Sequence, residues 1–142
     1  MATTQSTRTP DTAGTSGRRD RSPLYSSLIG LAALGVVLQG LWAGLFIREG
    51  KEVNDSWVHV HALDGEITIA LALVATIVAI VQLRHRRGLV VGSIVFTVLL
   101  VLEAFIGGLV GSHQALQEIH FPLALALVGL AVWLPLRASQ RA

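Results

Sequence analysis

The chain has 142 residues, of which 52% are hydrophobic and only 14% are charged, with a formal net charge of +2. This composition is too apolar for a soluble domain of this length, and the basic residues flank apolar segments, which excludes a nucleic-acid-binding surface. The absence of cysteine excludes disulfide bonds and thiolate metal sites.

The first 22 residues form a tail that is rich in Ser, Thr, Gly and Arg. Because such a composition buries too little apolar surface to fold, residues 1–22 are predicted to be disordered. Arg18, Arg19 and Arg21 then precede a long apolar block, as the charged region of a signal peptide would. The block is longer than the apolar region of a cleaved signal peptide, so we expect an uncleaved first helix.

Four segments are long and apolar enough to cross a membrane, which takes about 20 mostly apolar residues. They cover residues 24–47, 60–83, 89–111 and 115–136. The second carries Asp64 and Glu66 in its first turns, and these side chains are expected to face interfacial water. The sequence therefore predicts an all-α, four-transmembrane-helix bundle over residues 23–137 and a short tail at residues 138–142.

The positions of the arginines predict the orientation of the bundle. Arginines lie in the N-terminal tail, in the connection Arg84-His85-Arg86-Arg87 and in the C-terminal tail. The first connection has mixed charge, and the third, residues 112–118, has no Lys or Arg. By the positive-inside rule, both termini and the second connection lie in the cytoplasm, in a multi-pass protein of the cytoplasmic membrane that is surrounded by membrane lipid.

The two predicted hairpins resemble each other. Residues 38–46 (LQGLWAGLF) align with residues 102–110 (LEAFIGGLV), which equates Gln39 with Glu103. Each hairpin tip is followed by a histidine that opens the returning helix, His61 in the first and His120 in the second. The pattern is compatible with two parallel repeats related by an axis along the membrane normal.

The polar residues of the two hairpins are expected to form one layer. The midpoint of Gln39 and His61 and that of Glu103 and His120 both fall in the predicted hairpin tips. At about 1.5 Å per residue, all four residues would lie roughly 10 Å below the outer end. Polar and ionisable side chains at such a depth are energetically costly and mark a candidate functional site.

Two neutral imidazoles that face each other across a four-helix bundle can supply both axial ligands of a haem. Without cysteine for covalent attachment, the group would be haem b, as in b-type cytochromes. We expect His61 and His120 to bind the haem iron, with Glu103 and Gln39 behind them, in a protein of electron transfer or haem handling. A membrane redox partner or a homo-oligomer would be compatible with this function. Flat space for the ring is expected beside small residues, which are Gly65, Ala124, Gly107, Gly40 and Gly44.

Several alternatives stay open at this point. His59 lies about 200° around the helix from His61 and is the alternative ligand. The polar layer could instead fix helix register in a cofactor-free membrane scaffold or in an accessory subunit of a larger complex. A third alternative is a non-haem metal site built from His59, His61, Asp64, Glu66 and His120. No catalytic triad or phosphate-binding loop is present, so enzymatic activity stays open and would depend on a cofactor.

The segment His61-Ala62-Leu63-Asp64-Gly65, together with residues 103–109 and 120–127, resembles one four-helix half of the haem A synthase family. The resemblance implies a four-helix membrane fold with a histidine near the outer ends of the second and fourth helices. That family has a glutamate three residues before a histidine and an arginine after it, where this chain has Val58, Gln117 and Ala62. These departures argue against synthase activity and leave haem binding open. The chain is also similar to small uncharacterised four-helix membrane proteins of actinobacteria.

Overall fold

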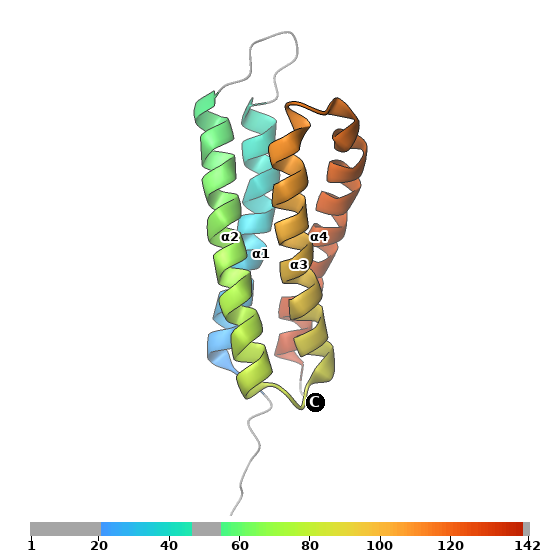
Figure 1. Cartoon of the computed structure of the whole chain (residues 1–142). Helices are drawn as coiled ribbons and strands as arrows, with labels where there is room; N and C mark the ends of the chain where they lie inside the picture. The colour runs from blue at the N-terminus through green and yellow to red at the C-terminus, as the bar shows by residue number, and fades with distance from the viewer. Residues whose placement is uncertain (1–20, 47–54, 141–142) are drawn as a thin grey trace, which may run out of the picture.

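The computed structural model describes residues 21–46 and 55–140 and contains four long helices (Figure 1). These are α1 (Pro23–Phe46), α2 (Asp55–Gln82), α3 (Arg87–Val110) and α4 (Gln117–Ser139), with one short 3₁₀ turn, η1 (Gln114–Leu116), before α4. All four are long and apolar enough to span a membrane. The predicted all-α, four-transmembrane-helix bundle is confirmed. In lipid, a helix satisfies its backbone hydrogen bonds within the segment, which explains why these apolar runs are helical throughout.

The helices extend further than the apolar segments alone indicate. Helix α2 begins at Asp55, before its predicted start at residue 60, and α4 continues to Ser139, beyond residue 136. Polar turns at a membrane surface stay helical because water and headgroups accept their exposed backbone groups. Residues 1–20 of the predicted disordered tail lie outside the described residues, whereas Ser22 is buried and its hydroxyl donates to Oε1 of Gln82 (2.7 Å).

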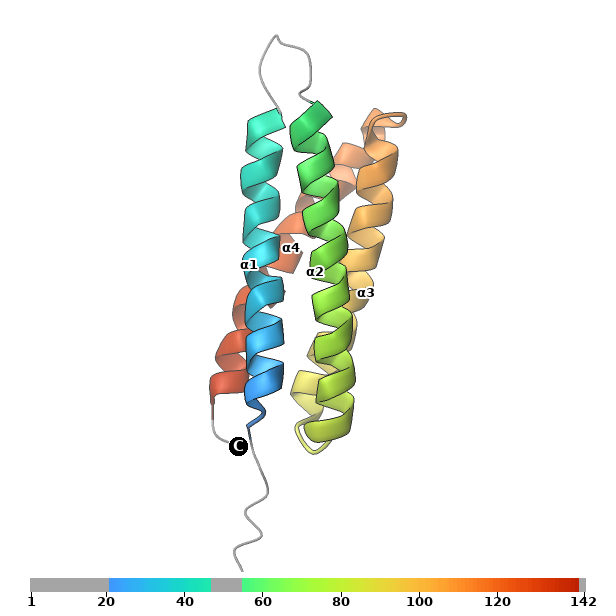
Figure 2. The same ribbon diagram turned by 90° about the vertical axis from the view of Figure 1, so that its left-hand side faces the viewer.

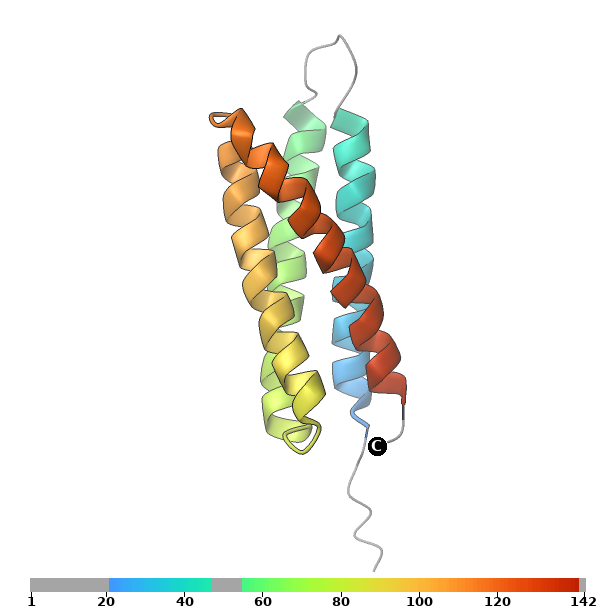
Figure 3. The same ribbon diagram turned by 90° about the vertical axis from the view of Figure 1, so that its right-hand side faces the viewer.

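The helices pack as a ring in which each contacts two neighbours. Helix α1 contacts α2 and α4, and α3 contacts α2 and α4, so that α1 faces α3 and α2 faces α4 across the bundle. Helices α1 and α2 run side by side over their whole length (Figure 2). Helix α4 is oblique: it crosses from the upper end of α3 to the lower end of α1 (Figure 3). The bundle thus consists of two hairpins, α1–α2 and α3–α4, whose histidine-bearing helices lie on one diagonal.

Small residues allow the helix backbones to approach closely at two points. A Cβ atom on Gly35 of α1 would overlap the hydroxyl of Thr68 on α2, and one on Gly92 of α3 would lie 2.6 Å from the Trp133 ring of α4. Such close approaches are typical of transmembrane helices, which associate by packing and hydrogen bonding because lipid is as apolar as their side chains.

A cluster of buried hydroxyl groups joins three helices in the lower half of the bundle. The Tyr25 hydroxyl on α1 hydrogen-bonds to Oγ of Ser93 on α3 (2.8 Å), across the diagonal. The Thr76 hydroxyl on α2 lies 2.9 Å from the hydroxyl of Thr97 and donates to the Ser93 carbonyl (3.1 Å). This cluster fixes the rotation of α1, α2 and α3 about their axes.

Replacing Tyr25 with phenylalanine is expected to lower the free energy of unfolding by about 1 kcal/mol, because it leaves the buried Ser93 hydroxyl without this partner. Unfolding of the detergent-solubilised protein in a denaturing detergent measures the change. Ser27→Ala, which removes an exposed hydroxyl from the same helix, is the control and should change stability little. A loss of similar size in both variants would contradict the role of the diagonal hydrogen bond.

Candidate functional site

A reciprocal pair of hydrogen bonds joins α1 and α2 near the upper end of the bundle. The side-chain amide of Gln39 donates to the carbonyl oxygen of His61 (2.9 Å) and to Oδ2 of Asp64 (2.8 Å). In return, Nδ1 of the His61 ring lies 3.2 Å from the carbonyl oxygen of Gln39. Gln39 and His61 each contribute one side-chain group and one backbone carbonyl to these contacts, which fix the register of the first hairpin.

This contact assigns the tautomer of His61. A carbonyl oxygen can only accept a hydrogen bond, so Nδ1 must carry the proton in the neutral ring. Nε2 then holds the lone pair, and it has no hydrogen-bond partner among residues 21–46 and 55–140. A histidine held through Nδ1–H with a free Nε2 has the arrangement found for imidazole ligands of metals.

The second hairpin brings a histidine and a carboxyl group together at the corresponding place. Nδ1 of His120 on α4 lies 3.0 Å from Oε1 of Glu103 on α3, and the two side chains are 20% and 14% exposed. The ring N–H does not point along this contact, so Nδ1 of His120 and Oε2 of Glu103 are buried atoms without a hydrogen-bond partner. A small rotation of the His120 ring would therefore allow its Nδ1–H to donate a hydrogen bond to the Glu103 carboxyl group.

The ring of His120 lies against the backbone of α3. A Cβ atom on Gly107 would lie 3.0 Å from Cε1 of His120 and 3.7 Å from its Nε2. A side chain at this position would require the ring to shift by a few tenths of an ångström, so glycine lets the ring pack closely against the helix. Gly107 is one helical turn from Glu103, so a single face of α3 positions both the ring plane and its carboxyl neighbour.

The two histidines belong to helices that face each other across the bundle. His61 lies on α2 and His120 on α4, which form a diagonal and do not pack directly on each other within the described part of the chain. Both histidines are partly buried. Each histidine contacts the polar residue that the hairpin midpoints place opposite it, Gln39 for His61 and Glu103 for His120.

Aromatic side chains cover the layer on the side of the first hairpin. Phe46 contacts the His61 ring edge to face, with ring centroids 5.4 Å apart. Trp42 and Trp57 are stacked, with centroids 5.6 Å apart and planes inclined by 11°. In the second hairpin, Phe121 lies beside His120 with the centroids 5.9 Å apart. Aromatic rings therefore contact both histidines of the polar pairs.

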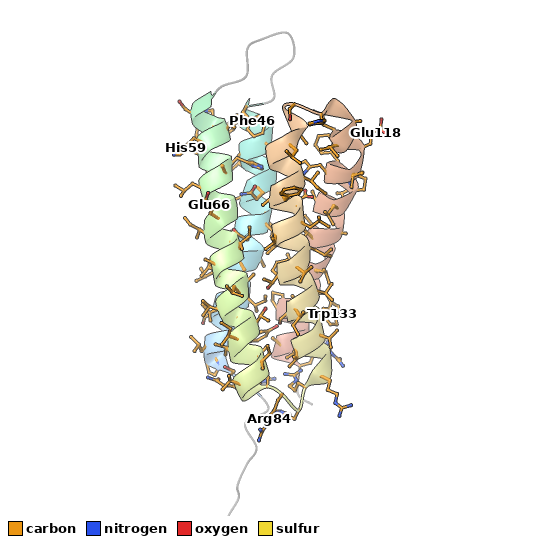
Figure 4. All side chains as sticks on the ribbon, in the orientation of Figure 1. Phe46, His59, Glu66, Arg84, Glu118 and Trp133 are labelled. Atoms are coloured by element: carbon orange, nitrogen blue, oxygen red, sulfur yellow. The ribbon has the colours of Figure 1, made fainter. Side chains whose placement is uncertain are left out.

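The other candidate histidines lie elsewhere. His59 is exposed on the outer side of α2 (Figure 4), so His61 is the inward-facing histidine of the pair. His113 is exposed and its Nδ1 lies 2.9 Å from the hydroxyl of neighbouring Ser112. His85 lies in the connection between α2 and α3, among the arginines. Of the five histidines of the chain, only His61 and His120 take part in the polar layer.

Two expectations about individual residues are wrong, those for Asp64 and for the pair Gly40 and Gly44. Asp64 does not face interfacial water but is partly buried and accepts the Gln39 amide. An added Cβ atom on Gly65 would lie 3.7 Å from the Gln39 amide, an ordinary contact distance, and the expected place of Gly65 beside a haem stays a prediction. Gly40 and Gly44 are exposed and have no neighbour within 4 Å of an added Cβ, so they leave no room inside the bundle. Glu66 is exposed, as expected (Figure 4).

Two features of the site were not found from the sequence. The interaction of Asp64 with Gln39 was missed, although the spacing of His61 and Asp64 by three residues places them on one helix face. The Trp42–Trp57 stack was also missed, because its residues are separated by a connection whose length does not reveal which rings meet.

The donor set fits a two-ligand haem better than a bare metal ion. Within residues 21–46 and 55–140, no three His, Asp or Glu side chains gather as ligands of one metal ion. The described residues instead supply two imidazoles from opposite helices, a carbonyl acceptor for Nδ1 of His61, a carboxyl group 3.0 Å from Nδ1 of His120 and a glycine beside the His120 ring. Axial ligation of a haem needs only two such donors, because the porphyrin fills the remaining four positions.

Comparison of the chain with protein-family models, with curated proteins and with solved structures gives no match.

Proposed function

We propose that the protein is an integral membrane b-type haem-binding protein, with His61 and His120 as axial ligands, that acts in electron transfer or haem handling. One observation carries the proposal: two imidazoles lie on diagonal helices, with Nδ1 of His61 hydrogen-bonded to the Gln39 carbonyl and Nδ1 of His120 3.0 Å from the Glu103 carboxyl group, and neither Nε2 has a hydrogen-bond partner among the described residues. The partial resemblance to half of the haem A synthase family supports haem binding in particular, and the departures from its motif speak against synthase activity.

Each residue of the layer has a distinct part in this function. The Gln39 carbonyl holds the His61 ring in the tautomer that exposes a lone pair at Nε2. The Glu103 carboxyl group lies 3.0 Å from Nδ1 of His120 and would accept its proton after a small rotation of the ring, which would increase the electron donation of that ring, and Gly107 leaves space for it. A haem bound here would supply a one-electron Fe(III)/Fe(II) couple. The aromatic residues Trp42 and Phe46 exclude water from this side of the layer.

The proposed location is the cytoplasmic membrane, with both termini and the Arg84–Arg87 connection inside. The arrangement of charges supports this orientation, because the positive-inside rule places arginine-rich ends in the cytoplasm. Among the described residues, the exposed arginines lie at the end of the bundle that holds the α2–α3 connection. The haem layer would then lie in the outer half of the bilayer.

Addition of haemin to the detergent-purified protein tests the proposal by absorption spectroscopy. We expect one haem per chain, a sharp Soret band and, after reduction, the narrow α-band of a low-spin haem with two histidine ligands. His61→Ala and His120→Ala should each abolish this low-spin spectrum, and the double variant should bind no haem specifically. His59→Ala and His113→Ala are matched controls, since both remove exposed histidines, and their spectra should be unchanged.

The competing function is a cofactor-free scaffold in which the polar layer only fixes helix register. The reciprocal Gln39–His61 hydrogen bonds favour it, because they hold α1 to α2 without any ligand. A wild-type protein that stays folded, monodisperse and colourless in the presence of haemin would support the scaffold and refute haem binding. An unchanged spectrum in the double histidine variant would refute the assigned ligands.

A further inference from the structure

The charged side chains of the bundle are segregated between its two ends. The described acidic side chains lie in the upper half: Asp64, Glu66, Glu103 and Glu118. The described arginines gather at the lower end, around the α2–α3 connection and the C-terminal end of α4, as Arg84 in Figure 4 illustrates. We call this the basic end; its members are Arg21, Arg84, Arg86, Arg87 and Arg137.

Two of these arginines are engaged within the protein. Arg21 donates to the carbonyl oxygen of Ser139, and Arg86 donates to the carbonyl oxygens of Arg137 (2.7 Å) and Ala138 (3.3 Å). They satisfy the last carbonyl groups of α4, which have no helical partner, and complement the negative end of its dipole. Their role is therefore to attach the end of α4 to the rest of the bundle.

The other three arginines have no acidic partner within the described part of the chain. Arg84 and Arg87 are exposed, and Arg137 is exposed and donates only to the side chain of Gln140 (2.8 Å). They come from three different elements, namely the α2–α3 connection, the start of α3 and the last turn of α4. Uncompensated positive charges thus surround the basic end.

Two of these arginines have an exposed apolar neighbour one helical turn away on their own helix. Val91 follows Arg87 by four residues on α3 and is 58% exposed, and Trp133 precedes Arg137 by four residues on α4 and is 42% exposed. Arg84 follows the end of α2 by two residues, and Val81 in the last turn of that helix is 69% exposed. Residues four apart share a helix face, so Arg87 and Arg137 lie on the same face as an exposed apolar side chain. A phospholipid has the same order of groups, with a phosphate above an acyl chain.

We propose that the basic end binds anionic phospholipid headgroups. Arg84, Arg87 and Arg137 contact the phosphate groups, and the apolar neighbours below them contact the acyl chains. Guanidinium groups bind phosphate through two parallel hydrogen bonds, and cationic clusters next to a membrane span attract anionic lipid. A zwitterionic lipid carries its own ammonium group and gains less from this surface. The proposal depends only on the basic end and is independent of haem binding.

Quenching of tryptophan fluorescence by brominated lipids tests the proposal. The chain has three tryptophans, so Trp42→Phe with Trp57→Phe leaves Trp133, beside Arg137, as the single reporter. The protein is placed in phosphatidylcholine vesicles that contain either brominated phosphatidylglycerol or brominated phosphatidylcholine at equal mole fraction. We expect an association constant for phosphatidylglycerol about fivefold higher than for phosphatidylcholine. Equal quenching by the two lipids would overturn the proposal.

Variants at the arginines locate the binding surface. Combined replacement of Arg84, Arg87 and Arg137 by glutamine should reduce the preference to about one. Arg87→Gln alone should reduce it in part, whereas Gln117→Glu, which changes the net charge equally at the other end of α4, should leave it unchanged. A preference that survives the triple replacement would refute the assigned arginines.

Native mass spectrometry of the unmodified chain provides a second readout that needs no tryptophan replacement. Phosphatidylglycerol adducts should be retained to higher collision energy than phosphatidylcholine adducts, and the combined replacement of Arg84, Arg87 and Arg137 by glutamine should remove most of the difference. Equal retention of the two lipids by the wild-type chain would overturn the proposal by this route as well.

Discussion

Replacing Gly35 with alanine is expected to lower the free energy of unfolding by about 2 kcal/mol. The added methyl group would overlap the hydroxyl of Thr68 and come within 3.2 Å of its Cβ atom. Thr68 is 1% exposed and branched at Cβ, so it has little freedom to rotate away, and α1 must move away from α2. Unfolding of the purified protein in mixed micelles of mild and denaturing detergent measures the change. Gly35→Leu should prevent a stable fold.

Gly40→Ala is the matched control for this prediction. Gly40 lies on the same helix, but an added Cβ atom meets nothing within 4 Å. Alanine in place of glycine stabilises a helix interior by up to about 1 kcal/mol, so this variant should be as stable as the wild type or more so. If Gly35→Ala and Gly40→Ala had the same stability, the close approach of α1 and α2 at Gly35 would be wrong.

Replacing Gln39 with leucine is expected to lower the free energy of unfolding by about 3 kcal/mol. The leucine has a similar size but donates no hydrogen bond, so the partly buried Asp64 carboxyl group loses the amide that now lies 2.8 Å away. Leaving such an acceptor unsatisfied costs more than a typical neutral hydrogen bond contributes. The backbone carbonyl that holds the His61 ring remains, so haem added to this variant should still give a low-spin spectrum.

A double-mutant cycle isolates the contribution of the Gln39–Asp64 contact. Gln39→Leu, Asp64→Leu and the double variant are compared in the same unfolding experiment, and the two losses should be clearly less than additive in the double variant. Asp64→Asn, which keeps an oxygen acceptor for the amide, should lose no more than about 1 kcal/mol. Additive losses would show that the two side chains do not interact in the membrane.

The number of helices and the position of the polar layer follow from sequence patterns. Apolar runs of about 20 residues predict spans by length alone, and an antiparallel hairpin places residues equally far from its tip at one height. That rule brought His61 to Gln39 and His120 to Glu103, and both pairs are in contact in the structure. Such pairs are predictable because a short connection between two antiparallel helices fixes the relative height of their residues along the membrane normal.

The rotation of the helices and the place of the glycines did not follow from the sequence. Gly40 and Gly44 have the spacing of a packing motif and yet are exposed, whereas Gly35 and Gly92 lie at the close contacts. In a transmembrane helix the lipid-facing side and the interior side are both apolar, so hydrophobic periodicity does not reveal which face is buried. Polar residues do indicate the buried face, because they must find a partner inside the bundle. The position of Gln39 therefore predicted its contact with His61 correctly, whereas the spacing of the glycines did not predict the packed face.

The range of sequence separations among the polar contacts has a consequence for biogenesis. Gln39 and His61 are 22 residues apart. If the translocon releases the first two helices together, these two residues can form their hydrogen bonds before the rest of the chain is made. Tyr25 and Ser93, by contrast, are separated by 68 residues and meet only after a third helix has been inserted. The nascent chain can therefore form the contacts within the first hairpin, near the upper end of the bundle, before the contacts between the hairpins near its lower end complete the assembly.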